Sequence, residues 1–161
     1  MFSRSILRAW PLMFLSWVAA TGSPLHAADW SATNLQLLHG NDFVLGPTSR
    51  SIMTLEHADG WAYGDNFFFV DVTDPDSAGT DLYAEFAPRL SLSRLTGRSI
   101  GFGPVKDFLV AGQVNHGQDF RAFLYGAGLD LAVPGFSFVQ LNFYRRDVPA
   151  VPGATWQVTG V

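Results

Sequence analysis

The sequence contains no cysteine and little charge. Of its 161 residues, 15 % are charged and 48 % are hydrophobic, whereas about a quarter of the residues in a typical soluble domain are charged. The absence of cysteine excludes disulfides, thiolate metal sites and cysteine catalysis. The net charge is −4 and no Lys/Arg cluster is present, so the chain lacks the basic surface that binds a phosphate backbone. We therefore expect no nucleic-acid partner.

Long apolar runs are also scarce. The basic residues Arg4 and Arg8 precede the short apolar run Ala9–Ala20, which is the pattern of a secretory signal peptide. We predict a signal peptide at residues 1–28 and one mature domain at residues 29–161. No later apolar stretch has the length of about eighteen residues that a transmembrane helix needs. A mature chain in a membrane would therefore have to be a β-barrel, because only helices and closed barrels satisfy the backbone in lipid.

What the sequence does contain is alternation, clearest over residues 81–93. One face carries Leu82, Ala84, Phe86, Leu90 and Leu92, and the other carries Tyr83, Glu85, Arg89, Ser91 and Ser93. Successive residues of a strand point to opposite sides, so we predict a strand with one apolar and one polar face. A tilted strand of about ten residues is long enough to cross a bilayer. Pro88 cannot donate to a sheet ladder, and we predict a β-bulge there.

Similar segments, separated by Gly and Pro turn signals, occupy the rest of the mature chain. The predicted strands are residues 30–43, 51–59, 62–73, 81–93, 106–115, 119–133, 136–147 and 154–161. No helical period is evident, so the predicted fold class is all-β, an antiparallel up-and-down meander of about eight strands. In the third segment Phe67, Phe69 and Asp71 share one side, which we place inward because Asp71 would be costly in lipid.

The run FAPRLSLSRLTG followed by FGPVKDF, within residues 81–108, resembles a hairpin of the Tsx-like outer-membrane family. That family includes nucleoside-specific channels and related vibriophage-receptor porins. The resemblance implies a transmembrane β-barrel in the outer membrane that passes small solutes, nucleosides in particular, without catalysis or cofactors. Family members are longer and close their barrels, so we expect the barrel here to be incomplete or open, with truncation at Val161 the favoured explanation.

Polar and aromatic residues on the predicted inner faces are the candidate ligand-binding residues. They are Tyr83, Glu85, Arg89, Tyr144, Phe67, Phe69 and Asp71. The rings could stack on nucleobases, as the resemblance implies, or instead contact lipid or form the interfacial aromatic girdle that barrels carry. Glu85 and Arg89, four residues apart on the same face, could select solutes or simply form an ion pair with each other.

No metal site or enzyme active site is predicted. His39, His57 and His116 lie on separate predicted strands without a metal-ligand spacing. The acidic segment 74–81 could hold calcium through oxygen ligands, but it lacks the EF-hand spacing, and a solvated loop is the better interpretation. The sequence has no Gly-x-Ser-x-Gly motif and no convincing Ser–His–acid set.

Two alternatives stay open at this point. The first is an envelope receptor whose loops bind a phage or another surface ligand, without specific transport. The second is a soluble lipocalin-like binder. A soluble barrel has its apolar face inward and a membrane barrel has it outward, in contact with lipid. Exposure of Phe123, Leu129, Leu141 and Phe143 would favour the membrane protein.

Overall fold

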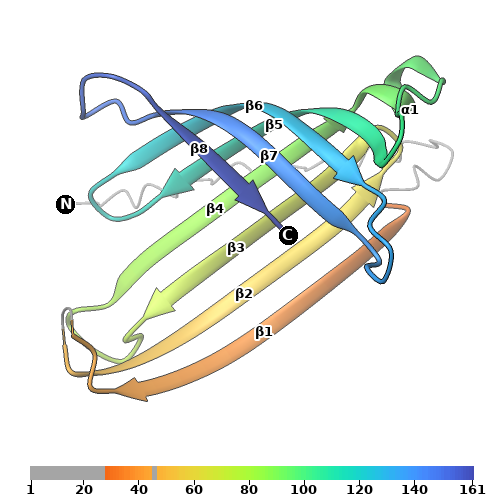
Figure 1. The fold of residues 1–161 in the computed structure, drawn as a ribbon. Helices are drawn as coiled ribbons and strands as arrows, with labels where there is room; N and C mark the ends of the chain where they lie inside the picture. Colours follow the sequence, from red (N-terminus) through yellow and green to blue (C-terminus); the bar gives the residue numbers. More distant parts are fainter. Residues whose placement is uncertain (1–27, 45–46) are drawn as a thin grey trace, which may run out of the picture.

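The computed structural model describes residues 28–44 and 47–161. The predicted signal peptide lies outside these residues except for Ala28. The described chain forms one eight-stranded antiparallel sheet whose strands follow one another in sequence order, with β1 and β8 at its two edges (Figure 1). The strands are β1 Trp30–Asn41, β2 Ser49–Trp61, β3 Gly64–Thr73, β4 Asp81–Ser91, β5 Val105–His116, β6 Arg121–Leu131, β7 Val139–Asp147 and β8 Thr155–Gly160. The predicted all-β meander is confirmed, and the predicted ranges agree to within a few residues at each end.

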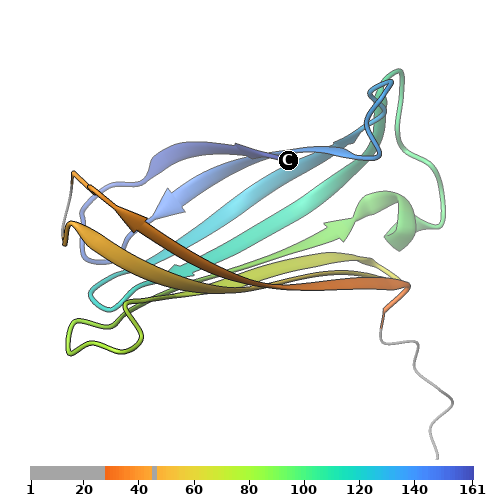
Figure 2. The ribbon, with the colours of Figure 1, turned by 90° about the horizontal axis from the view of Figure 1, so that it is seen from below.

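The sheet is strongly curved. Figure 2 shows β5 to β8 curling over β1 to β4, so that the sheet has a concave and a convex face. Trp30 on β1 and Val161 after β8 line the same pocket on the concave face. The two edges of the sheet therefore converge on one cavity, although β1 and β8 are not paired with each other in the described chain.

The apolar side chains lie on the convex face. Phe86 on β4 is 47 % exposed and Phe123 on β6 is 39 % exposed, and Phe143 on β7 is also exposed. Leu129 and Leu141 share that face and are half-buried. The concave face instead buries polar groups, namely Arg89, Ser91, Gln113, Asn115 and Asn142. A lipocalin-like binder needs the reverse arrangement, so that alternative is wrong.

Along one row of cross-strand neighbours the side chains change from polar to apolar and back to polar, as expected for the tilted strands of a barrel. Cross-strand partners form the row Thr33, His57, Phe68, Phe86, Val114, Phe123 and Asp147 on the convex face. The row begins with polar residues near the start of β1 and the end of β2, is apolar across β3 to β6, and ends with an aspartate at the end of β7. A row perpendicular to strands tilted by about 40° crosses a membrane-sized apolar band diagonally in this way.

A short helix replaces the end of the predicted fourth strand. Leu92 and Ser93 were predicted to continue the alternation, and this is wrong: both lie in α1, Leu92–Thr96. The Ser91 side chain caps the helix by accepting the Arg94 N–H, and Gly97, with φ of 66°, ends it. Ser at the N-cap and a left-handed Gly after the last turn favour a helix over a continued strand. Among the described residues, no helix has the length and apolarity needed to span a membrane.

The predicted bulge at Pro88 is also wrong. Phe86 pairs with Val114 and Arg89 with Ala111, so the β4–β5 register is the same on both sides of the proline. The ladder leaves out the pairs between them without inserting a residue, and Gly112 lies beside the proline ring. An unmade pair is enough to accommodate the missing N–H. The irregularity lies instead between Val105 and Asp107, at the start of β5.

Candidate functional site

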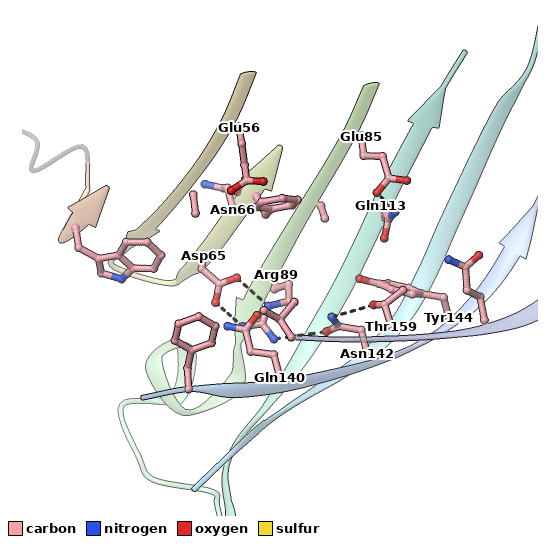
Figure 3. Close-up of a pocket in the computed structure, with 17 residues that line it drawn as sticks. Glu56, Asp65, Asn66, Glu85, Arg89, Gln113, Gln140, Asn142, Tyr144 and Thr159 are labelled. Carbon is pink, nitrogen blue, oxygen red and sulfur yellow. Dashed lines mark hydrogen bonds and ion pairs between the residues drawn. The ribbon is translucent and has the colours of Figure 1, made fainter. Parts of the chain in front are cut away.

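The concave face holds a pocket of about 780 Å³ (Figure 3). Side chains from β1 to β5, β7 and β8 line it, so it belongs to the whole curved sheet and not to one loop. Its polar lining includes the carboxylates of Glu56, Asp65 and Glu85 and the amides of Gln113 and Asn142. Pockets of roughly 300–1,000 Å³ hold small organic ligands.

Arg89 is the best-connected side chain in this pocket. It is 3 % exposed. Its Nε donates to Asp65 Oδ1 over 2.8 Å and its Nη2 donates to Asp65 Oδ2 over 2.7 Å (Figure 3). Nη2 also lies 3.0 Å from Asp130 Oδ1. Its Nη1 donates a longer hydrogen bond of 3.5 Å to Asn142 Oδ1. One guanidinium therefore connects β4 with β3, β6 and β7.

The curvature of the sheet makes this reach possible. Strands β4 and β7 are separated by β5 and β6, yet Arg89 contacts Asn142 directly. The contact passes over Gly128 on β6, where a Cβ would lie 2.7 Å from Asn142 Oδ1 and 3.6 Å from Arg89 Nη1. The missing side chain at Gly128 leaves the space that the Arg89–Asn142 contact occupies.

The expected ion pair between Glu85 and Arg89 does not form. Glu85 accepts hydrogen bonds from the Tyr83 hydroxyl and from Gln113 Nε2, the latter over 2.7 Å, and Gln113 also donates to Asn115 over 2.8 Å. Residues four apart on one strand are separated by roughly 13 Å. Asp65 is the direct cross-strand partner of Arg89, at the spacing where opposite charges meet.

Aromatic rings form a track along the inner wall. The ring centroids of Phe67 and Phe69 are 6.1 Å apart, those of Phe69 and Tyr83 are 5.8 Å apart, and those of Tyr83 and Phe120 are 6.0 Å apart. Phe67 lines the pocket. The intervening Phe68 points to the opposite face of the sheet, where it lies 5.3 Å from His57. The structure thus places Phe67 and Phe69 inward, as the sequence predicted.

The remaining predicted site residues are on the same face. Tyr144 lines the pocket but is 1 % exposed and packs with Ala111, Ala122 and Leu124. Asp71 accepts a hydrogen bond of 2.5 Å from Thr54, towards the β3–β4 end of the sheet. These two side chains are therefore held by protein contacts, in contrast to the open ring of Phe67.

Several lining residues were not among the predicted site residues. The polar ones are Glu56, Asp65, Asn66, Gln113, Gln140, Asn142, Gln157 and Thr159. A signal existed for Asp65, which has the same parity as Phe67, Phe69 and Asp71 on β3. No clear signal existed for Glu56, because β2 alternates poorly. No group of three or more His, Asp or Glu residues that could hold a metal ion occurs in the part of the chain that the structure describes.

Comparison with known proteins identifies the family. The family described as "Nucleoside-specific channel-forming protein, Tsx" matches residues 27–149. Outer membrane protein OmpK of Vibrio parahaemolyticus is 30 % identical over 161 residues, which cover 83 % of this chain and 59 % of the relative. Two proteins named nucleoside-specific channel-forming protein Tsx are each 24 % identical. The alignment with the protein from Klebsiella aerogenes covers 83 % of this chain and 51 % of the relative. The alignment with the protein from Klebsiella pneumoniae covers 89 % of this chain and 56 % of the relative.

The chain thus spans between about half and three fifths of the length of these relatives. The match extends over nearly the whole described sheet, including the hairpin from β4 to β5 that carries Arg89 and the short helix. The apolar convex face and the polar concave face agree with the β-barrel fold of that family. This chain is an outer-membrane protein and belongs to the Tsx family of nucleoside-specific channel-forming proteins.

Proposed function

We propose that the protein forms part of the wall of an outer-membrane channel for the passive passage of small solutes. The concave face, with its buried polar residues and its pocket of about 780 Å³, is the wetted side of this channel. The convex face, with exposed Phe86, Phe123 and Phe143, contacts outer-membrane lipid. No catalytic step or cofactor is needed, because the solute moves down its own gradient.

We further propose that the solutes are nucleosides. The single observation that carries this proposal is the aromatic track of Phe67, Phe69, Tyr83 and Phe120 on the polar side of the sheet. Stacking of a base on an aromatic side chain contributes about 1–3 kcal/mol and tolerates all bases. Phe67, at one end of the track, lines the pocket together with the amides of Gln113 and Asn142 and the carboxylate of Glu85, which can bind ribose hydroxyls. A nucleoside combines a flat base that can stack on the aromatic rings with a ribose whose hydroxyls can bind the polar side chains.

Conductance across a planar bilayer tests this proposal. The reconstituted protein should conduct ions, and a bound nucleoside such as adenosine should reduce that conductance by occupying the lumen. Phe69→Ala should weaken the block, by about tenfold if one stacking contact is lost. Phe68→Ala is the matched control, because this neighbouring ring lies on the opposite face. A conductance that adenosine leaves unchanged would remove the nucleoside specificity while keeping the channel.

A further inference from the structure

We propose that the charges of the inner face make the channel select cations over anions. This inference rests on the proposed channel function and concerns the same lumen. Carboxylates outnumber guanidinium groups on the concave side of the strands. By contact or strand parity, the inward carboxylates are Glu56, Asp65, Asp71, Asp81, Glu85, Asp107 and Asp130, and the inward guanidinium groups are Arg50, Arg89 and Arg146.

Their orientation follows from contacts and register. Glu56, Asp65, Glu85 and Arg89 line the pocket directly. Asp130 contacts Arg89, and Asp107 accepts a hydrogen bond from the buried Ser91. Asp71 is in register with Tyr83, while Arg50 and Arg146 have the parity of Glu56 and Tyr144 on their strands. The histidines His39, His57 and His116 have the opposite parity and add no charge to the lumen.

Most of these carboxylates are not neutralised by a neighbouring cation. Asp65 and Asp130 both contact Arg89, so two negative charges share one positive charge. Glu85 is held by Tyr83 and Gln113, and Asp71 by Thr54, all of which are neutral donors.

Asp107 accepts from Ser91 and from backbone N–H groups, which are neutral too. Glu56 has no hydrogen-bond or ion-pair partner among the described residues. When the charges lining a narrow passage are mostly negative and its walls have a low dielectric constant, their electric field is concentrated in the passage. The negative potential therefore extends into the water of the lumen, where it concentrates cations and repels anions, as acidic rings do in cation channels.

Arg89 does little to oppose this effect. Its guanidinium is 3 % exposed and holds two carboxylates, so it offers no free positive charge to a passing anion. Arg50 and Arg146 have no carboxylate within 4.0 Å among the described residues, so removal of either cation should strengthen the negative field.

The reversal potential in a KCl gradient measures the selectivity. We expect a K⁺/Cl⁻ permeability ratio of roughly three or more at about 0.01 M salt, where the Debye length is about 30 Å. The ratio should approach one in about 1 M salt, where the Debye length is about 3 Å. Glu56→Gln and Glu85→Gln should each lower the ratio, and Arg146→Gln should raise it. Arg145→Gln is the matched control, because Arg145 alternates with the inward Tyr144 and Arg146 and so lies on the convex face of β7.

A second measurement keeps the inference testable if the protein does not conduct. Hexaamminecobalt(III), a trivalent cation, should bind the detergent-solubilised protein in calorimetry. Binding should be weaker for the double variant Glu56→Gln/Glu85→Gln and unchanged for Arg145→Gln. Absence of conductance with intact, Glu56/Glu85-dependent cation binding would count against the channel alone. A ratio at or below one, or cation binding that is the same in the double variant, would overturn the inference.

Discussion

The carboxylate of Asp65 and the guanidinium of Arg89 are direct cross-strand partners and form a two-pronged ion pair, with N–O distances of 2.8 and 2.7 Å. The pair lies on the polar side of a sheet whose other side is apolar. Arg89 is buried in it, whereas 22 % of the Asp65 side chain is exposed to the pocket. The arrangement lets a charged side chain be part of the concave face without protruding into the pocket.

Removal of Arg89 should destabilise the fold. Arg89→Ala leaves Asp65 and Asp130 near each other without a cation, and breaking a buried pair from one side costs about 3–5 kcal/mol. The partial exposure of both carboxylates reduces this, so we expect a loss of about 2–3 kcal/mol in the free energy of unfolding. Urea titration of the protein folded in lipid vesicles measures it.

The control for this measurement is Arg94→Ala. Arg94 also contacts a carboxylate, Asp29 at 3.4 Å, but both side chains are largely exposed. Exposed pairs contribute between about 0 and 1 kcal/mol. Arg89→Lys should recover only part of the loss, because an ammonium cannot match both carboxylate oxygens at once. Equal losses for the Ala variants at residues 89 and 94 would contradict the central role of the buried pair.

The alternation of side chains was enough to predict the strands and their faces. Parity put Phe67, Phe69 and Asp71 on one side, the cost of Asp71 in lipid turned that side inward, and the register with β4 agrees. Helix α1 was missed because Leu92 and Ser93 continue the alternation by chance, while the cap of Ser91 and the turn at Gly97 decide the local structure. Alternation of apolar and polar residues says nothing about whether a helix cap such as Ser91 begins a helix at the same place.

The partners of Arg89 could not be derived in the same way. Parity places Asp65 and Asp130 on the inner face but does not give the β3–β4 register, which makes Asp65 the direct neighbour. Asp130 and Asn142 come within reach only because the sheet curves. Curvature depends on the whole sheet, including the open space at Gly128, and not on any single strand.

The hydroxyl and the ring of Tyr83 should have separable roles. Tyr83→Phe removes the donor to Glu85 and keeps the ring between Phe69 and Phe120. Tyr83→Ala removes both. If the track binds bases, nucleoside affinity should fall by about tenfold in Tyr83→Ala and much less in Tyr83→Phe. Block of the single-channel current by adenosine measures both, and equal losses would assign the effect to the hydroxyl.

A side chain at Gly128 should obstruct the lumen wall. Even a Cβ there would be 2.7 Å from Asn142 Oδ1, so Gly128→Val must displace the Arg89–Asn142 contact or narrow the pocket. We expect lower conductance and reduced stability. Ala127→Val is the control, since the adjacent Ala127 is exposed on the convex face. Unchanged conductance in Gly128→Val would show that the passage does not run past this point.

The assignment of the two faces can be tested with one pair of neighbouring residues. Phe86 lies at the centre of β4 on the convex face and is 47 % exposed, whereas Ala87 lines the pocket. An arginine at the lipid-facing midplane of a barrel costs roughly 2–4 kcal/mol, while lumen substitutions are tolerated because water hydrates the charge. Phe86→Arg should therefore reduce the yield of protein folded into vesicles far more than Ala87→Arg does. Ala87→Arg should also lower the K⁺/Cl⁻ permeability ratio, because it adds a cation beside Glu85 and Asp65. If both variants folded equally well, or if Ala87→Arg were the more damaging, the lumen and lipid faces would have to be exchanged.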